Sequence, residues 1–488
     1  MGSEWRKVKL EEVASEITVG YVGSMTSEYI ESGVPFLRSK NVDPFTVNLD
    51  DIKYISPEFN ERLKKSALAP GDVVIVRTGK PGTCAVIPQW LENANCSDLV
   101  IVRCGPEINN RFLAYYVNTV ASSHVNAHLV GAVQQHFNVG SAKLMELSLP
   151  PLEIQDKIVS ILAALDNKIA LNRQINTTLE SMARALFKSW FVDFDPVIDN
   201  ALAAGHEIPD ALQTRAQARA AKREALRQQT NKTANETTGA TDAASSEQAL
   251  PETDLSDQRL PSEIQQRFPD RFVFTEEMGW VPEGWEVKTI GDVIETTGGG
   301  TPSTKNPDFW EGGVHPFCTP KDMSQLTSWV LMDTERHLTD DGVNKISSGQ
   351  LPKGTVLMSS RAPIGYLAIS DVPVSVNQGV IALLPNTVFG PLYLLNWLHA
   401  NLGAIMDRAN GSTFLEISKK NFRPIPFLIP SDDVAKAFNE QAKAIQQKLL
   451  LLAEETVSLT NLRDSLLPKL LSGQVTIPDA EQQLAEVL

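Results

Sequence analysis

The length and charge of this chain exclude several simple classes of protein. At 488 residues it is too long for one ordinary hydrophobic core, so we expect several domains. It carries 44 basic and 59 acidic residues, and a formal net charge of −15 is the wrong sign for a protein that holds DNA by phosphate neutralisation alone. Its apolar residues form no run near the ~20 positions that would span a bilayer.

The N-terminal residues and the cysteines add two further expectations. The stretch Met1–Lys7 lacks the apolar core of a secretory signal, so we expect the chain to stay in the cytoplasm. The cysteines show neither Cys-x-x-Cys spacing nor a paired histidine, so we expect no zinc site and no disulfide frame. These cysteines are Cys84, Cys96, Cys104 and Cys318.

The second half of the chain repeats the first. Trp5 and Trp285 open similar strings that lie 280 positions apart. Each half then carries a Gly-Val string that ends in Pro-Phe, an aliphatic strand pattern after a turn, and a second aliphatic run. The matching segments are Gly33–Phe36 and Gly313–Phe317, Gly71–Ile75 and Gly354–Met358, and Leu99–Val102 and Val380–Leu384. This period predicts two equivalent modules of short strands, loops and a few helices, which is an α+β fold class.

A long heptad helix follows each module. Apolar residues recur at alternating spacings of four and three over about four heptads, which is typical of a coiled coil. The first predicted seam is Ile154, Ile158, Ile161, Leu165, Lys168, Asn172, Ile175, Leu179, Met182 and Leu186. The second predicted seam is Val434, Phe438, Ile445, Lys448, Leu452, Leu459, Leu462 and Leu466. Two such helices in one chain can pair with each other.

Polar residues interrupt both seams. Lys168 and Lys448 are equivalent, and Asn172 follows one turn after Lys168. A polar layer weakens an apolar seam but can fix its register, whereas an extended lysine can also reach out of the seam into water. We expect the substitution Asn172→Leu to stabilise the helix pair.

The region between the two halves has a different composition. Residues 210–230 are rich in Ala, Gln and Arg and could form a solvated helix, while residues 230–256 contain almost no large apolar side chain. Such a stretch cannot bury enough surface to offset its ordering entropy, so we interpret 197–270 as a linker that is partly disordered. Its basic cluster could contact DNA, but a solvated surface is the commoner state of exposed charge runs.

No catalytic constellation stands out in the sequence. A Gly-x-x-x-x-Gly-Lys-Ser/Thr phosphate loop and a His-Glu-x-x-His motif are both absent, and the 7 histidines are scattered singly. Asp193 and Asp195 could be imagined as paired carboxylates, but a turn after a helix is the simpler interpretation. We therefore expect a chain that is not itself an enzyme.

Binding chemistry is better represented than catalysis. Side chains that can donate to or accept from base edges gather in the loops between predicted strands, at corresponding places in both halves. The first half offers Arg38, Lys40, Arg77, Thr78, Lys80, Gln134, Gln135 and His136. The second half offers Thr301, Ser303, Lys305, Lys321, Ser360, Arg361, Gln378, Lys419 and Lys420. Any one of them could be an ordinary solvated loop residue, and the matching of the loops is what favours binding.

Several strings resemble a known family. Ala185–Pro196 (ALFKSWFVDFDP) is similar to the central conserved region of the specificity subunits of type I restriction-modification systems, and Leu462–Gly473 (LRDSLLPKLLSG) is similar to their distal conserved region. Pro282–Trp285 and Gly299–Ser303 resemble the usual opening of a target-recognition domain. The first half has Val19–Ser24 in place of such a Gly-Gly-Thr-Pro-Ser string, and domains that read different sequences are expected to differ there.

The resemblance implies a non-catalytic subunit that selects a DNA sequence. Two target-recognition domains would each read one half of a bipartite, asymmetric double-stranded DNA target, and two long helices would pack between them as an antiparallel coiled coil. Two methyltransferase subunits, and two restriction subunits in the full complex, would carry the chemistry and bind S-adenosylmethionine, ATP and Mg²⁺. The implied parts are recognition domain 1 (1–150), the central helix (151–196), the linker (197–270), recognition domain 2 (271–430), and the distal helix with the C-terminal tail (431–488).

In such a subunit the helices would act as a spacer. A helix from Ile154 to Leu186 is about 50 Å long at ~1.5 Å per residue, enough to hold two modules about one helical turn of DNA apart. Insertion of four residues into both helices should lengthen the gap between half-sites by about two base pairs, because ~6 Å corresponds to about two steps of ~3.4 Å.

Two alternatives stay open on the sequence alone. The acidic charge also fits a coiled-coil scaffold with two protein-binding domains and no direct DNA contact. The aromatic group Trp190, Phe191 and Phe194, just past the first helix, is either internal core or a docking patch for a methyltransferase subunit.

Overall fold

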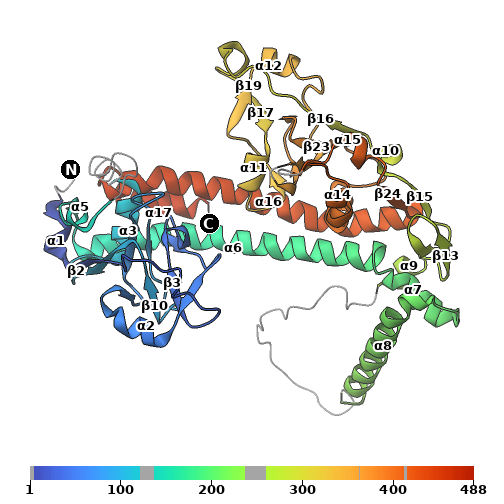
Figure 1. Ribbon diagram of the computed structural model, residues 1–488, viewed down its shortest axis with the longest axis horizontal. Helices are drawn as coiled ribbons and strands as arrows, with labels where there is room; N and C mark the ends of the chain where they lie inside the picture. The colour runs from blue at the N-terminus through green and yellow to red at the C-terminus, as the bar shows by residue number, and fades with distance from the viewer. Residues whose placement is uncertain (1–4, 121–136, 237–259, 362, 412–414, 488) are drawn as a thin grey trace. The chain divides into compact units, whose positions relative to one another are not determined.

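The computed structural model describes residues 5–120, 137–236, 260–361, 363–411 and 415–487. It divides into two compact units, each of which mixes helices with short strands (Figure 1). Unit 1 comprises Met1–Ala170 and Val457–Leu488, and unit 2 comprises Leu171–Thr456. Among the described residues, no helix combines the length and the apolar character that a bilayer crossing requires.

Unit 1 is built around a four-stranded sheet in the order β2-β11-β8-β9. A second sheet has the order β6-β3-β10-β7, and β1 pairs antiparallel with β12. The strands are β1 (Arg6–Lys9), β2 (Ala14–Val19), β3 (Val34–Leu37), β4 (Val42–Asp43), β5 (Thr46–Val47), β6 (Lys53–Ile55), β7 (Ala67–Leu68), β8 (Val73–Val76), β9 (Cys84–Val86), β10 (Ala94–Cys96), β11 (Leu99–Cys104) and β12 (Glu146–Leu149). The helices include α1 (Leu10–Val13), α2 (Pro57–Arg62), α3 (Asn110–Thr119), α5 (Val139–Lys143) and α17 (Ile477–Ala485).

The central strands of this sheet are buried on both faces. Val73 and Ile75 of β8 face a core that includes α3 and segments of the long helices, whereas Val74 and Val76 face the second sheet. A strand covered on both faces needs apolar residues at every position, because neither side meets water. This is why β8 and β11 appear in the sequence as unbroken aliphatic runs rather than as alternating patterns.

Unit 2 repeats this plan. Its main sheet has the order β16-β23-β20-β21-β18, a second sheet has the order β19-β17-β22, and β15 pairs antiparallel with β24. The strands are β13 (Phe272–Thr275), β14 (Gly279–Pro282), β15 (Glu286–Thr289), β16 (Thr296–Gly298), β17 (His315–Cys318), β18 (Val330–Leu331), β19 (Arg336–Leu338), β20 (Val356–Ser360), β21 (Ile364–Ser370), β22 (Ser375–Val376), β23 (Val380–Leu383) and β24 (Pro426–Ile429). The helices include α10 (Ile290–Val293), α11 (Pro320–Ser324), α12 (Asp340–Asn344), α13 (Pro391–Ala400), α14 (Leu402–Asp407) and α15 (Lys419–Phe422).

Strand registers identify equivalent residues in the two units. The parallel pair β3·β10 places Leu37 opposite Cys96, and the parallel pair β17·β22 places Cys318 opposite Val376. Gly20 follows β2 as Gly299 follows β16, and both glycines lie against the backbone of the equivalent residues Cys96 and Val376. The predicted repeat is therefore confirmed, and Gly20 is the structural counterpart of Gly299, the first glycine in the Gly-Gly-Thr-Pro-Ser string.

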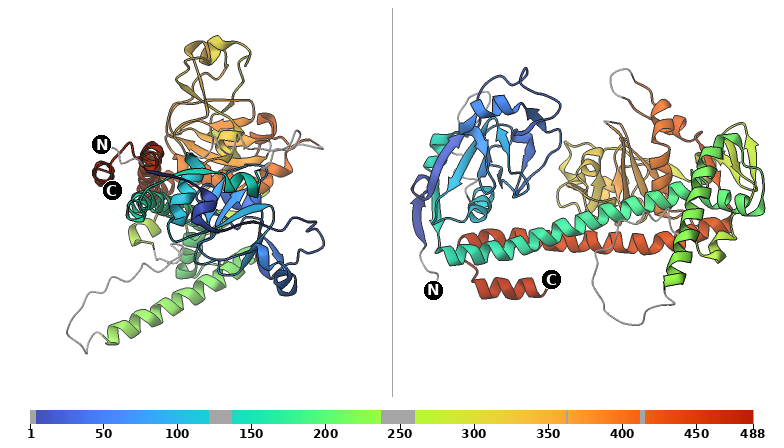
Figure 2. Two further views of the ribbon diagram at one scale, coloured as in Figure 1. Left: turned by 90° about the vertical axis from the view of Figure 1, so that its left-hand side faces the viewer. Right: turned by 90° about the horizontal axis from the view of Figure 1, so that it is seen from below.

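Two helices of 40 residues each contribute to both units. They are α6 (Leu152–Phe191) and α16 (Asp432–Leu471), and segments of the two lie side by side within each unit (Figures 1 and 2). In unit 2, Asn172 donates from Nδ2 to Glu455 Oε2 at 2.9 Å, while Phe187 contacts Phe438 with ring centroids 5.9 Å apart. As the residue numbers rise along α6, the numbers of the residues they contact in α16 fall. These segments are therefore antiparallel.

The predicted seams describe the helix pairing with one clear exception. Nearly all the seam residues are buried or half-buried, including Lys168, which is half-buried, and Asn172, which is buried. Lys448 is exposed, so its assignment to the seam is wrong, and the buried positions nearby are Leu449 and Leu452. A helix of 3.6 residues per turn drifts against a strict heptad spacing, and here the apolar stripe has moved by one residue.

The predicted linker is helical in much of its described part. It contains α7 (Asp195–Ala204), α8 (Asp210–Glu236) and α9 (Ser262–Gln265), and α8 leaves the body of unit 2 as a single helix (Figure 1). The helix expected at 210–230 is therefore present, and it continues beyond the point where the composition suggested an end. The rest of the predicted disorder falls on 237–259, outside the described residues.

Arginine–aspartate pairs fasten α8 to α7. Asp195 is buried and accepts two hydrogen bonds from the Arg215 guanidinium, each 2.7 Å long. Ser189 Oγ donates to the same carboxylate at 2.8 Å, and Arg219 pairs with Asp199 one turn further on. The base of α8 is thus anchored by charge-assisted bonds, because its own apolar stripe is short. The sequence interpretation of Asp195 as a simple turn residue missed this network.

The aromatic group at the C-terminal end of α6 belongs to the core of unit 2: Trp190 and Phe191 are the last two residues of the helix, and Phe194 follows it. Trp190 packs edge-on against Phe268 with centroids 5.0 Å apart, and Phe191 lies 5.2 Å from the ring of Phe438. Trp190, Phe191 and Phe194 are all at least nine-tenths buried. The docking hypothesis is therefore wrong for these three side chains, and the core alternative is confirmed.

Candidate nucleic-acid interface

In unit 2, glycines bring the candidate side chains together at the ends of β16, β20 and β22. A Cβ added to Gly299 would lie 1.5 Å from the Val376 carbonyl oxygen, so this loop packs directly on the end of β22. A Cβ added to Gly298 would lie 3.5 Å from Lys419 Nζ. One added to Gly379 would lie 3.2 Å from Arg361 Nε. Because these three glycines have no side chain, there is room for the Lys419 and Arg361 side chains and for the close contact with the Val376 backbone.

Gln378 lies on this surface between the two glycine contacts. Its side chain is exposed, and its Oε1 accepts a hydrogen bond of 2.8 Å from Thr301 Oγ1. Arg361 is partly exposed and lies 3.8 Å from Glu416, whereas Lys419 is exposed at the start of α15. We call Thr301, Arg361, Gln378 and Lys419 the unit 2 rim. A hydroxyl, an amide and two cations on one surface can read base edges and hold phosphates.

The equivalent surface of unit 1 is organised around a carboxylate. Asp98 accepts a hydrogen bond of 2.9 Å from the Arg77 guanidinium and another from the Thr78 hydroxyl. Its φ of +55° places it in the left-handed region, which aspartate tolerates better than most residues. Arg77 Nε also donates to the Phe137 carbonyl at 3.2 Å. We call Arg77, Thr78, Asp98 and the exposed Lys80 the unit 1 rim.

A backbone hydrogen bond shows that the two rims are equivalent. The Phe137 amide donates to the Arg77 carbonyl at 3.0 Å, and the Ile417 amide donates to the Ser360 carbonyl at 3.0 Å. Arg77 therefore stands at the position of Ser360. The side chain of Ser360 is buried, so a direct contact of Ser360 with DNA is excluded in this conformation, and the prediction for it is wrong. Its neighbour Arg361 reaches the surface instead.

A second group of candidates follows β3 and β17. Arg38, Lys40 and Lys53 all bind the Asp51 carboxylate. These contacts lower the pKa of Asp51 well below its usual range, and the hydrogen bond from Lys40 makes the largest contribution. The equivalent Lys321 of unit 2 binds Glu335, which raises the pKa of Lys321. These cations are already neutralised by acids of their own units, so each contributes less to phosphate binding than a free lysine does.

The remaining candidates are exposed but lie outside the two rims. Lys420 is exposed next to Lys419, and Ser303 and Lys305 are exposed in the loop after β16. The Ser303 carbonyl accepts from Trp310 Nε1 at 3.1 Å, which holds that loop in place. Gln134, Gln135 and His136 lie outside the described residues.

Sequence reasoning missed the acids that pair with its candidates. Asp51, Asp98, Glu335 and Glu416 each bind a candidate cation. For Asp98, a signal was available, because an aspartate in a short turn between two buried strands is a frequent left-handed residue. For the others, the pairing depends on loops that meet only in the folded unit.

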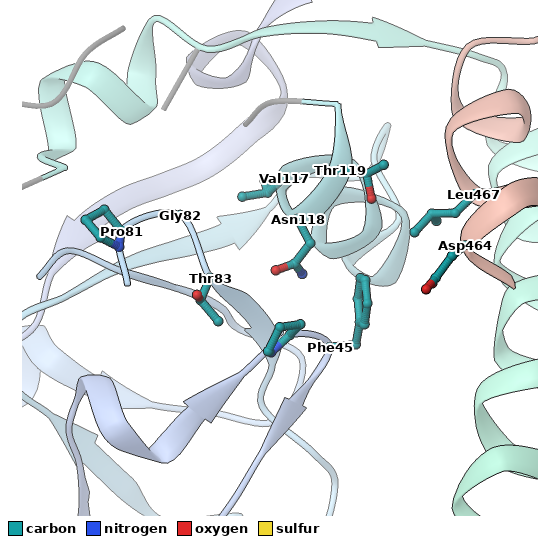
Figure 3. Close-up of a pocket in the computed structure, with 10 residues that line it drawn as sticks. Phe45, Pro81, Gly82, Thr83, Val117, Asn118, Thr119, Asp464 and Leu467 are labelled. Atoms are coloured by element: carbon teal, nitrogen blue, oxygen red, sulfur yellow. The ribbon is translucent and has the colours of Figure 1, made fainter. Parts of the chain in front are cut away.

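One described cleft of unit 1 has its carboxylate and its amide already paired within the unit. A cavity of about 430 Å³ lies in unit 1 between the loop at Phe45, the end of α3 and α16 (Figure 3). Its carboxylate, Asp464, binds Arg463, and its amide, Asn118, donates to the Cys84 carbonyl at 2.7 Å. Across the described parts of both units, no group of three or more His, Cys, Asp or Glu residues is placed to hold a metal ion.

Comparisons with known proteins give a consistent result. A family described as the type I restriction modification DNA specificity domain matches residues 2–181 and 282–450. The specificity subunit of the type I restriction enzyme HindI from Haemophilus influenzae is 32% identical over 344 residues, which covers 69% of this chain and 70% of that protein. The MjaIX specificity subunit of Methanocaldococcus jannaschii is 36% identical over 159 residues, covering 32% of this chain and 37% of that protein. Among solved structures, the S subunit of a type I restriction-modification system from M. genitalium is 15% identical, covers 96% of each chain and has a TM-score of 0.49.

Proposed function

This chain belongs to the DNA specificity family of type I restriction-modification systems, and from that membership we propose that it selects a bipartite, asymmetric DNA target for its complex. The observation that carries the proposal is the duplication. The family matches two separate segments, and the two units share one sheet plan. Two similar readers on one chain suit a target with two half-sites, and readers that differ in their polar side chains suit half-sites that differ in sequence.

The rims supply the base-reading chemistry of the proposal. The amide of Gln378 offers both a donor and an acceptor, which matches the major-groove edge of adenine. The carboxylate of Asp98 can only accept, which matches the exposed amino group of cytosine or adenine. Since equivalent places in the two units carry these different groups, we expect the two half-sites to differ.

Partner subunits would supply most of the phosphate contacts and all of the chemistry. The chain has a net charge of −15, and several of its candidate cations are paired with its own acids. We infer that two methyltransferase subunits, and two restriction subunits in the full complex, bind this chain in the cytoplasm. S-adenosylmethionine, ATP and Mg²⁺ would be bound by those partners, and this chain would perform no chemical step.

The 40-residue helices support a spacer role for α6 and α16. Insertions of four residues after Ala170 and after Thr456 would lengthen both helices by about 6 Å and the gap between half-sites by about two base pairs. Insertions of seven residues, which keep the heptad phase, would add about 10 Å, or about three base pairs. A gap that stays unchanged in both variants would contradict the spacer role.

Mapping of modified bases tests the proposal most directly. The chain would be produced with its methyltransferase subunit in a host that lacks adenine methylation, and modified positions would be read across the genome. We expect one split motif with a fixed gap between two unlike half-sites. Scattered modification, or one contiguous motif, would contradict the bipartite target.

One alternative is favoured by the acidic charge, namely a scaffold with two protein-binding domains and no DNA contact. Binding of the chain with its methyltransferase to DNA would be measured against salt concentration, with the methyltransferase alone as the control. The alternative requires equal affinity with and without this chain. The proposed function requires tighter binding to DNA that contains the mapped motif.

A further inference from the structure

A β-hairpin of unit 2 stands just before the repeated sheet and holds its own shape. Its strands β13 and β14 pair antiparallel, with Phe274 opposite Trp280. Thr275 Oγ1 donates to the Gly279 carbonyl at 3.1 Å and accepts from the Met278 amide at 3.2 Å. Gly279 has a φ of +75°, which suits a tight turn. The turn is therefore closed by the hairpin's own hydrogen bonds.

The base of the hairpin is fixed to the core of unit 2. Val281 and Pro282 are buried, and Phe272 packs against Phe194 with ring centroids 6.2 Å apart. The Glu283 amide donates to the Arg271 carbonyl at 2.9 Å, which ties the two strand ends together. A rigid base means that the tip presents its side chains at a defined place without further ordering.

The tip exposes large apolar side chains. Phe274 is 64% exposed, Met278 40%, Val273 37% and Trp280 37%. The rings of Phe274 and Trp280 pack edge to face, with centroids 5.5 Å apart. Single exposed apolar residues are ordinary, but an aromatic pair with an exposed methionine in the adjoining turn has the composition of an interface hot spot. We call Phe274, Met278 and Trp280 the hairpin patch; Val273 lies opposite Val281 on the other face of the hairpin.

Acidic residues around the hairpin patch restrict what can cover it. Glu276 and Glu277 are exposed in the turn, and Glu283 is exposed after β14. These carboxylates repel DNA phosphates, and a second copy of the chain would bring the same acids to the contact. The chain's own segment 237–259 has five Asp and Glu residues against one Arg, so its charge also disfavours it as an occupant.

We propose that the hairpin patch docks a protein subunit of the same restriction-modification complex, through apolar side chains of that subunit that are flanked by Lys or Arg. The proposal rests on the proposed function, because it takes the partner from that complex. Complementary charge around an apolar centre gives both orientation and a fast encounter. Three side chains make the centre of such an interface, and the rest of the contact lies around them.

The test removes the aromatic side chains of the hairpin patch and compares the subunit affinities of this variant with those of a matched surface variant. The double variant Phe274→Ser with Trp280→Ser would be titrated with purified methyltransferase subunit, and the resulting complex would be titrated with purified restriction subunit. We expect one of these two affinities to fall by about tenfold or more. The control is Trp90→Ser in unit 1, where the tryptophan is 60% exposed, and both of its affinities should equal those of the unchanged chain. Thermal unfolding of both variants verifies that each is folded.

A second variant tests the acidic residues beside the hairpin patch and leaves the core of unit 2 unchanged. The variant Glu276→Lys with Glu277→Lys should weaken the same affinity and reduce its dependence on salt, because an attractive charge pair becomes repulsive. The docking proposal is overturned if the patch and charge variants bind both subunits as tightly as the unchanged chain. It is also overturned if the molar mass of the free chain shows a dimer that the patch variant abolishes. Failure of the unchanged chain to bind either subunit would instead count against the proposed function.

Discussion

The two rims occupy equivalent places but differ in how much of their chemistry is used internally. In unit 1, Asp98 accepts hydrogen bonds from Arg77 and Thr78, so three of the four rim residues are paired with one another. In unit 2, Gln378 is exposed and bonds only to Thr301 among the described side chains, while Lys419 is exposed beside it. One scaffold thus carries a rim fixed by its own ion pair and a rim whose polar groups face solvent.

This difference shows which parts of a duplicated domain are free to change. The strands beneath the rims are buried on both faces and match in register, because each must fill the same space. The exposed rim residues such as Gln378, Lys419 and Lys80 fill no core, so their substitution has little effect on folding while it alters what can be bound. A family that needs many specificities can therefore vary the rims and keep the sheets.

The largest effect is expected at the glycine contact that both units share. Gly299→Ala would force the new methyl group into the Val376 carbonyl, and we expect a loss of about 2–3 kcal/mol in the stability of unit 2. Gly300→Ala is the control, because a Cβ there meets nothing within 4 Å. Gly20→Ala should destabilise unit 1 similarly. Hydrogen exchange resolved by unit measures each effect, and equal protection for all three variants would contradict the equivalence.

The second largest effect on stability is expected from removal of the Asp98 carboxylate in unit 1. Asp98→Ala leaves the mostly buried Arg77 without its carboxylate partner, and we expect a loss of about 2 kcal/mol, since the pair is partly open to solvent. The corresponding Gln378→Ala in unit 2 should change stability by less than about 0.5 kcal/mol. Urea unfolding followed by unit-resolved exchange compares them. Equal losses would show that the two rims are not organised differently.

A smaller effect is expected for the cations of the unit 2 rim. The double variant Arg361→Ala with Lys419→Ala should weaken binding of the methyltransferase complex to its target by about tenfold, or about 1.4 kcal/mol, and should lower the salt dependence. Lys7→Ala, which removes an exposed charge from β1, is the control. Competition binding at several salt concentrations measures both. An unchanged affinity in the double variant would remove the unit 2 rim from the DNA interface.

Disruption of the polar layer between α6 and α16 is expected to change the stability of the helix pair by about 1 kcal/mol. The sequence suggested that Asn172→Leu stabilises the pair, but Asn172 donates to Glu455. The single change removes that hydrogen bond beside a half-buried carboxylate and should cost about 1 kcal/mol. Asn172→Leu with Glu455→Leu should be at least as stable as the unchanged chain, because an apolar pair replaces a polar one. Melting temperatures measure both. A stabilised single variant would restore the sequence-based expectation.

The smallest effect concerns the pKa of Asp51. Lys40→Met removes the hydrogen bond that contributes most to its depression, so the pKa of Asp51 should rise toward its ordinary value of 3.8. A lowered pKa in the folded state means that the carboxylate stabilises the fold above that ordinary value and that this contribution disappears as the pH falls through the folded pKa. Carboxyl-carbon NMR titration follows the group directly. A pKa that does not move would show that Lys53 and Arg38 suffice.

The hydrogen bonds of the rims and the burial of side chains were decided by tertiary structure. Ser360 and Lys448 were assigned to the surface and to the seam, and the fold places both of them elsewhere. For Trp190 the sequence left internal core and docking patch both open, and the fold places it in the core. Burial depends on what other segments bring to a position, and a local pattern carries no record of those segments. The pairing of Arg77 with Asp98, 21 residues apart, likewise depends on two strands meeting at their ends.

The sequence by itself determined the duplication, the α+β class, the two long helices and the membership suggested by the conserved strings. Each of these follows from periodicity or chain order, which local side-chain spacing expresses directly. Only the folded units decided which cations are neutralised by acids, which hydroxyl supports Gln378, and which aromatic groups are exposed on the hairpin patch. Those outcomes depend on distances between residues remote in sequence, and hydrophobic burial that drives folding fixes such distances without marking them locally.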